Sequence, residues 1–405
     1  MNGSTPHKPV STRFQKQRER ILDAATPLLN DRGVTGMRLE EVAQALGLTT
    51  TSILYYFRRK EQLAAAVFED SMDRLETIAE EALAEPSPKT RVRRYVELHF
   101  DYHAATLRGE VRPLAILSEI RALEDPIRGA LIEQYQQVFR KVRAFFGATD
   151  DGHRRTLLTG RAHMLNEALF WLHLWLPRHS ISDFPNVRRR FLAILEKGIA
   201  APGTSWPTPE TRTDEPVDEP SGASAFLSAA TRLINEFGYR GASIDRIAAE
   251  LNLTKGSFYH YLDAKDDLVL ECYRASHRRI LHFQERIEAR GEGAWQQLAS
   301  GIAKALEYQF SGDFPILRST ALQAMPTGLK TQALELFNRT ALRISGLIVE
   351  SIEAGQARLC DPLIASHIVM STINSAYDIR GWARRQPLDR AIATYGRILM
   401  NGIFD

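Results

Sequence analysis

Apolar residues recur at helical spacing along both parts of the chain, and no segment shows the sustained alternation of a β-strand. The helical patterns are long and are separated by short breaks at Gly or Pro. Residues 200–224 interrupt them with five prolines, several acidic residues and almost no apolar periodicity. Because such a segment cannot build a packed element, the sequence predicts an all-α protein whose two halves are joined by a proline-rich linker.

The two halves repeat one another. Shifted by 205 positions, residues 21–63 align with residues 226–268 without a gap, and 16 of the 43 paired positions are identical. Most core positions that differ carry conservative exchanges. The sequence therefore predicts a tandem duplication, with one copy on each side of the linker.

Each copy predicts two short helices around a tight turn. In the first copy Gly47 lies at the turn, and Asn252 occupies that place in the second copy. Gly and Asn are the residues that best tolerate a left-handed backbone. Thr49 and Thr254 follow at the N-cap position, where a hydroxyl accepts hydrogen bonds from first-turn amides. Two short helices around a capped tight turn form a helix-turn-helix (HTH).

These motifs resemble a known family. GYRGASIDRIAAELNLTKGSFYHYLDAKDDL looks like the DNA-binding domain of the TetR family of bacterial transcriptional repressors, and GVTGMRLEEVAQALGLTTTSILYYFRRKEQL is similar to it. The spacing, turn residue, cap, aromatic run and final Lys-x-x-Leu agree in both copies. The resemblance implies that the second HTH helix enters the major groove of a DNA operator. It also implies that the helical remainder of each half binds a ligand and makes a dimer contact.

The residues expected to contact DNA surround the start of the second HTH helix. They are Arg38, Thr49, Thr50, Thr51, Ser52, Tyr55, Tyr56 and Lys60 in the first copy, and Ser243, Thr254, Lys255, Gly256, Ser257, Tyr259, His260, Tyr261 and Lys265 in the second. The copies differ at informative places: Leu54 stands where the second copy has Tyr259, and Arg38 replaces the Ser243 cap. These differences predict that the two copies recognise unlike half-sites.

Charge is distributed unevenly although the net charge is only +3. Residues 1–205 hold 30 Lys/Arg against 25 Asp/Glu (+5), and residues 206–405 hold 22 against 24 (−2). A basic arm of Arg13, Lys16, Arg18 and Arg20 precedes the first HTH, whereas the acidic residues 214–219 precede the second. The positive first half is compatible with a nucleic-acid partner.

Other function classes find little support. Hydrophobic residues make up 44% of the chain and charged residues 25%, which is typical of globular proteins. The longest apolar stretch is too short for a membrane span, and residues 1–10 lack the apolar core of a secretory signal. The two cysteines do not have the spacing of a disulfide framework or a metal site. We therefore expect a cytoplasmic protein. His99 and His103 have the spacing of a metal pair but lack an evident third ligand. No catalytic constellation is present, so we expect neither an enzyme nor a cofactor.

The repeat and the resemblance together predict the domain organisation. The last two helices of each half are expected to form one four-helix bundle within the chain, giving a covalent pseudo-dimer; a homodimer with four HTH units is the alternative. The expected segments are a disordered tail (1–12), the first HTH domain (13–60), the first ligand-binding and dimerisation domain (61–200), the linker (201–223), the second HTH domain (224–266) and the second ligand-binding and dimerisation domain (267–405).

Pocket candidates lie in both helical domains, although simple core packing is the alternative role for most of them. They are His103, His163, Asn166, Phe170 and Trp171 in the first half, and Phe314, Asn374, Tyr377 and Asp378 in the second. A mostly apolar pocket suits a hydrophobic or acyl-type effector. We therefore expect a repressor of TetR type that is released by a small effector and recognises an asymmetric operator. The alternative is a helical interaction protein that keeps this fold but has lost DNA reading in one or both units.

Overall fold

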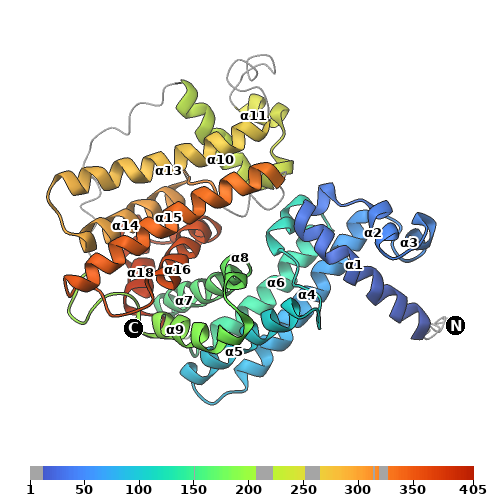
Figure 1. Ribbon diagram of the computed structural model, residues 1–405, viewed down its shortest axis with the longest axis horizontal. Helices are drawn as coiled ribbons and strands as arrows, with labels where there is room; N and C mark the ends of the chain where they lie inside the picture. Colours follow the sequence, from blue (N-terminus) through green and yellow to red (C-terminus); the bar gives the residue numbers. More distant parts are fainter. Residues whose placement is uncertain (1–11, 150, 207–221, 251–264, 313–314, 319–326) are drawn as a thin grey trace.

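The computed structural model describes residues 12–149, 151–206, 222–250, 265–312, 315–318 and 327–405, and these residues form helices joined by short segments (Figure 1). The first half contains α1 (Thr12–Gly36), α2 (Leu39–Ala45), α3 (Thr50–Tyr56), α4 (Lys60–Leu83), α5 (Pro88–Leu107), η1 (Leu117–Ala122), α6 (Ile127–Ala144), α7 (Gly152–Phe170), α8 (Leu172–Trp175), η2 (Leu176–Arg178), η3 (Ile181–Asp183) and α9 (Phe184–Lys197). The second contains α10 (Gly222–Gly241), α11 (Ile244–Glu250), α13 (Lys265–Ala289), α14 (Ala294–Ser311), α15 (Thr327–Glu353), α16 (Pro362–Ser375), η5 (Ala376–Ile379), α17 (Arg380–Ala383) and α18 (Leu388–Asn401). The all-α class predicted from the sequence is confirmed.

The repeat is visible in how each HTH unit begins. Its first helix breaks at a glycine, Gly33 in α1 with φ 65° and Gly238 in α10 with φ 74°. These glycines are 205 positions apart, and a left-handed backbone at this point favours glycine because the residue has no Cβ. The break turns the chain into the short helix that follows, α2 or α11.

The hydrophobic core of each HTH unit continues into the domain behind it, since it includes Ile120 and Leu131 in the first half and Leu317 and Ala333 in the second. Ile21, Val42 and Ile53 belong to the first unit's core, and Phe226 and Ile247 belong to the second unit's. All five are buried. Apolar packing therefore joins each HTH unit to the domain behind it.

The centre of the molecule is a four-helix bundle formed by α7 and α9 of the first half with α16 and α18 of the second (Figure 1). Within it the Nδ1 atom of His163 lies 2.7 Å from the Tyr395 hydroxyl. The indole N–H of Trp382 donates to the Thr156 carbonyl at 3.0 Å. One continuous hydrophobic core runs through both halves here. The bundle expected from the sequence thus forms within a single chain.

The ends of α9 and α18 cross at two glycines. The Ile199 N–H donates to the Met400 carbonyl at 2.8 Å, and the Ile403 N–H donates to the Leu195 carbonyl at 2.9 Å. A Cβ on Gly198 would lie 1.9 Å from the Met400 carbonyl oxygen. The close approach of the two halves at this point therefore requires glycine.

An asparagine ties each HTH unit to the domain behind it. The Asn30 amide donates to the carbonyl of residue 114 and accepts from the N–H of residue 116, both at 2.9 Å. Asn235 makes the same pair of bonds to residues 316 and 318, also at 2.9 Å. Each asparagine thus joins the first helix of an HTH unit to a loop behind it.

No helix in the described segments is both long enough and apolar enough to cross a membrane.

Candidate nucleic-acid interface and internal cavity

The first HTH unit has the turn that the sequence predicts. Gly47 has a φ of 65°, and α3 begins directly after Thr49. The Thr49 hydroxyl accepts a hydrogen bond from the Ser52 main-chain N–H at 3.3 Å. The predicted turn and N-cap are therefore confirmed, and together they fix the direction in which α3 leaves the turn.

One face of α3 is exposed. Tyr55 has 74% of its surface exposed and Leu54 has 40%. Thr51 is exposed as well and Thr50 is half-buried, whereas Ile53 points into the core of the unit. An HTH unit contacts base edges with the side chains at the start of its second helix. This face could therefore make such contacts, and DNA contact by these residues stays a prediction.

Two other residues predicted for the DNA surface make local contacts. Tyr56 is half-buried and packs on Phe14 of α1, with ring centroids 4.6 Å apart. Lys60 opens α4, and its Nζ donates to the Thr35 carbonyl at 2.8 Å. Both contacts hold α3 and the start of α4 against α1. A phosphate contact by Lys60 would have to replace or share this hydrogen bond.

Exposed cations flank α3. Arg38 lies at the N-cap of α2, where its side chain makes no capping hydrogen bond. Phe14 beside Tyr56 brings the first turn of α1 to the side of α3, and Arg13 and Lys16 are exposed on that turn. Cations beside a recognition helix favour the DNA backbone because they neutralise phosphates.

The second HTH unit is described through α10 and α11. The Ser243 hydroxyl accepts from the Arg246 N–H at 3.2 Å, so Ser243 caps α11. Lys265 is the first residue of α13. The predicted DNA contacts Thr254, Lys255, Gly256, Ser257, Tyr259, His260 and Tyr261 lie outside the described residues, as does the Lys265 side chain.

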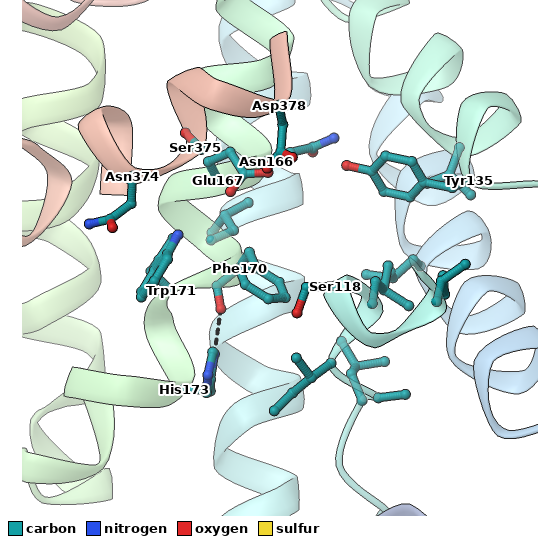
Figure 2. A pocket seen from close by; sticks show the side chains of 18 of the residues that line it. Ser118, Tyr135, Asn166, Glu167, Phe170, Trp171, His173, Asn374, Ser375 and Asp378 are labelled. Atoms are coloured by element: carbon teal, nitrogen blue, oxygen red, sulfur yellow. Dashed lines mark hydrogen bonds between the residues drawn. The ribbon is translucent and has the colours of Figure 1, made fainter. Parts of the chain in front are cut away.

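A cavity of about 930 Å³ lies behind the first HTH unit. Its walls come from α1, α5, η1, α6 and α7 of the first half and from α10, the loop at residues 315–318 and the end of α16 with η5 of the second. Figure 2 shows Phe170, Trp171 and His173 on one side of it, facing Ser118 and Tyr135 on the other. The volume is in the range of small-molecule sites, about 300–1,000 Å³.

The predicted pocket residues meet in this one cavity. Eight of the nine line it, namely His103, His163, Asn166, Phe170, Trp171, Asn374, Tyr377 and Asp378. The ninth, Phe314, lies outside the described residues. The sequence suggested separate candidates in each half, whereas here Asn374, Tyr377 and Asp378 of the second half complete the cavity of the first. The second half's own cavity measures about 90 Å³ where the structure describes it. Ligand binding by these residues stays a prediction.

Burial shifts the titration of several groups in the cavity wall. It raises the pKa of the Glu167 carboxyl to about 8, with the charge of Asp378 adding to the effect. It lowers the pKa of His163 to about 4. The Tyr95 hydroxyl donates to the Asn166 amide oxygen at 3.1 Å. Near neutral pH, Glu167 and His163 are therefore mainly uncharged, and this part of the wall favours apolar or neutral ligand groups.

Sequence reasoning missed the arginines of the cavity wall, among them Arg121 and Arg318 at the boundary between the halves. No motif marks either residue, because each becomes part of the site only when the two halves pack together. The repeat also gives no signal for the contact between η1 and α10, which joins segments more than 100 residues apart.

His99 and His103, which have metal-pair spacing, lie on α5. His99 is buried with its ring edge-on to Tyr95, at 4.6 Å between centroids. No group of three or more potential metal-binding side chains occurs in the part of the chain that is described. Both histidines also line the internal cavity.

Two segments of the chain match the family described as bacterial regulatory proteins, tetR family: residues 21–67 and 226–272. Each matched segment contains one predicted HTH motif. The family comparison thus finds one HTH segment in each half, in agreement with the duplication seen in the sequence.

Relatives correspond to one half of this chain. It is 24% identical over 183 residues to the HTH-type transcriptional repressor DhaR of Mycobacterium sp. (strain GP1), covering 43% of this chain and 90% of DhaR. It is 22% identical over 152 residues to the fatty acid metabolism regulator protein of Bacillus subtilis (strain 168), covering 37% and 78%. A solved structure, the TetR family transcriptional regulator PfmR from Thermus thermophilus, matches at 22% identity with a TM-score of 0.35, covering 43% and 96%.

Proposed function

We propose a specific function for this chain, which belongs to the TetR family of bacterial regulatory proteins and carries the family's HTH segment twice. It is a DNA-binding transcriptional regulator and not an enzyme. In our proposal it represses transcription as a single-chain pseudo-dimer, binds an asymmetric operator and is released by a small apolar effector. The observation that carries the proposal is the large cavity whose wall includes the first helix of both HTH units.

The intramolecular bundle supports the single-chain arrangement. In a symmetric dimer two identical HTH units bind a palindrome about one DNA turn apart. Here the four bundle helices come from one chain and share one hydrophobic core. The two HTH units therefore stand on one scaffold without a second copy.

Differences between the HTH units support an asymmetric operator. Leu54 and Tyr55 are exposed on α3, and the second copy has Tyr259 and His260 at these positions. Tyrosine and histidine offer hydrogen bonds that leucine cannot make. Two HTH units with different side chains on the groove-facing helix would select different half-sites.

The cavity lining supports an apolar effector. Phe139, Leu169, Phe170 and Trp171 contribute much of its apolar surface. One of the relatives is named for fatty acid metabolism, which agrees with an effector that carries an acyl chain. Effector binding would shift the population between states in which the two HTH units have different separations, only one of which fits the operator.

Footprinting on the DNA upstream of the protein's own gene, at two salt concentrations and with the mass of the complex measured, tests the proposal. We expect one chain on an asymmetric site, with affinity falling steeply as salt rises. Two chains on a palindrome would overturn the single-chain arrangement. No affinity for any genomic fragment would overturn DNA reading itself.

Paired substitutions separate the roles of the two units. Lys255→Ala with Tyr259→Ala removes the expected contacts of the second unit, and Thr50→Ala with Tyr55→Ala removes those of the first. If both units read bases, each pair changes the sequence preference in one half-site only. If the first unit contacts only the DNA backbone, the Thr50→Ala and Tyr55→Ala pair weakens binding equally on all DNA sequences.

A further inference from the structure

Two arginines, one from each half, meet at the cavity wall. Arg121 belongs to η1 of the first half and Arg318 to the loop before α15 in the second. Both donate to the main-chain carbonyl of Asn235 in α10, Arg121 from Nη1 at 2.5 Å and Arg318 from Nη1 at 3.5 Å. The guanidinium groups therefore converge on one oxygen at the boundary between the halves.

Asp378 is the carboxylate that the described contacts pair directly with one of these two guanidinium groups. Arg318 is only 6% exposed and pairs with Asp378, while its Nε atom has no hydrogen-bond partner among the described residues. The two guanidinium hydrogen bonds of Arg121 go to main-chain carbonyls, those of Ser118 (2.5 Å) and Asn235. Burial lowers the pKa of Arg121 to about 10, and the charge of Arg318 lowers it further, whereas the nearby carboxylates of Asp378 and Glu119 act in the opposite direction. Glu167, with its pKa near 8, adds little negative charge at neutral pH.

The arginines lie on the wall of a chamber whose lining is mainly apolar but includes other polar side chains. Phe139, Phe170 and Trp171 line the same cavity from the first half. An amphipathic anion fits this arrangement of two cations beside a large apolar space. Its apolar part fills the chamber, and its anionic group binds the arginines.

We propose that the effector is an apolar molecule with a single anionic group, a carboxylate or a phosphate, and that this group binds between Arg121 and Arg318. The proposal rests on the proposed function, because it assigns a chemical class to the effector of the same cavity. Neither half forms this site alone. One chain would therefore bind one effector molecule at this shared site; the second half's own cavity measures about 90 Å³ within the described residues.

The same contacts explain how one molecule could act on both HTH units. The segment η1 contacts α1 as well as α10. On one side the Glu119 carboxylate accepts from the Val34 N–H at 3.3 Å, just after the break at Gly33. On the other side Arg121 donates to Asn235. An anion that takes over the Arg121 donors removes a contact with α10, and any shift of η1 also acts on α1.

Three probes with the same apolar tail test the head-group site: dodecanoate, dodecyl phosphate and uncharged dodecanol. Binding to the full-length protein is followed by calorimetry, which also gives the stoichiometry. We expect one anion per chain, and at least about tenfold weaker binding of dodecanol, since charge-assisted hydrogen bonds are lost. The ratio of dodecanoate to dodecyl phosphate affinity distinguishes a carboxylate from a phosphate effector.

Variants assign the site to the arginines. Arg121→Gln should weaken binding of the preferred anion at least about tenfold and leave dodecanol unchanged, while Arg121→Lys should keep part of the preference because the charge remains. The matched control is Arg339→Gln, an exposed arginine paired with Glu335. Circular dichroism verifies that each variant is folded.

Several results would overturn the proposal. Dodecanol binding as tightly as the anions would exclude a head-group site, and two anions per chain would exclude a shared one. Absence of binding by all three probes would exclude this class of effector. None of these results bears on DNA recognition, which the footprint decides separately.

Discussion

The indole of Trp175 in the first half stacks face to face on the imidazole of His367 in the second, with ring centroids 5.2 Å apart and planes 9° apart. Phe337 stacks on the same imidazole at 6.1 Å. Trp175 is 2% exposed and His367 3%. Aromatic rings from both halves thus interleave in the shared core, which couples the stability of one half to that of the other.

Trp175→Ala should therefore destabilise the whole molecule. Removal of a buried tryptophan leaves a cavity and costs about 3–5 kcal/mol in the free energy of unfolding. Since the core is shared, we expect the midpoints of both halves to fall together in urea unfolding, followed by circular dichroism and by hydrogen exchange of peptides from each half. Leu359→Ala, at a side chain 91% exposed, is the control and should change little. A lower midpoint in the first half alone would contradict a shared core.

Buried histidines predict a loss of stability in acid. Burial lowers the pKa of His99 to about 3 and those of His163 and His367 to about 4. The unfolded chain takes up these protons near pH 6.5 while the folded chain does not, so stability is present above pH 6.5 and falls as the pH drops toward 4. Each histidine contributes up to about 1.4 kcal/mol per pH unit.

Urea midpoints between pH 7 and 5 measure this slope. His367→Phe keeps a ring in the stack and removes the titrating group, so the slope should decrease by the contribution of one histidine. An unchanged slope in this variant would show that His367 already takes up its proton in the folded state.

Glu167 predicts the opposite trend at higher pH. Its pKa is raised by burial to about 8, so the folded chain holds a proton that the unfolded chain has released above pH 4.5. Its contribution is fully present below pH 4.5 and is lost as the pH rises to 8. Between pH 6.5 and 8 the loss is on the order of 2 kcal/mol. Glu167→Gln should remove this loss, whereas Glu335→Gln, at an exposed carboxylate, should retain it. Parallel pH profiles for the wild type and Glu167→Gln would contradict a neutral Glu167.

The sequence predicted the local features of the HTH unit because short-range chemistry determines them. A left-handed turn favours Gly47, and the hydroxyl of Thr49 reaches the N–H three residues later. The break at Gly33 and Gly238 is likewise set by one residue in each copy. The bundle, by contrast, was expected from the repeat and the family resemblance, and not from short-range chemistry.

The shared cavity could not be predicted in the same way. Its wall depends on contacts such as Arg121 with Asn235, which no periodicity or motif records. Duplication even suggests two equal pockets, because Asn30 and Asn235 hold equivalent loops. Within the described residues, however, the two cavities measure about 930 and 90 Å³, and the larger one takes part of its wall from the second half.

Arg38 and Ser243 occupy equivalent N-cap positions and predict opposite effects on stability. Ser243 accepts from the Arg246 N–H at 3.2 Å, whereas Arg38 makes no capping bond. Ser243→Ala should therefore lower, and Arg38→Ser should raise, the free energy of unfolding by about 1 kcal/mol. Chemical denaturation of the full chain measures both changes.

Arg38→Ser should also weaken DNA binding if the exposed guanidinium lies on a phosphate. The loss would be the same on all sequences, and the slope of log K against log salt would become shallower by about 1. Arg38→Gln removes the charge without restoring the cap, so it should reproduce the DNA effect with no gain in stability. An unchanged salt slope in both variants would place Arg38 away from the backbone, and a loss confined to one base pair would instead assign it to base recognition.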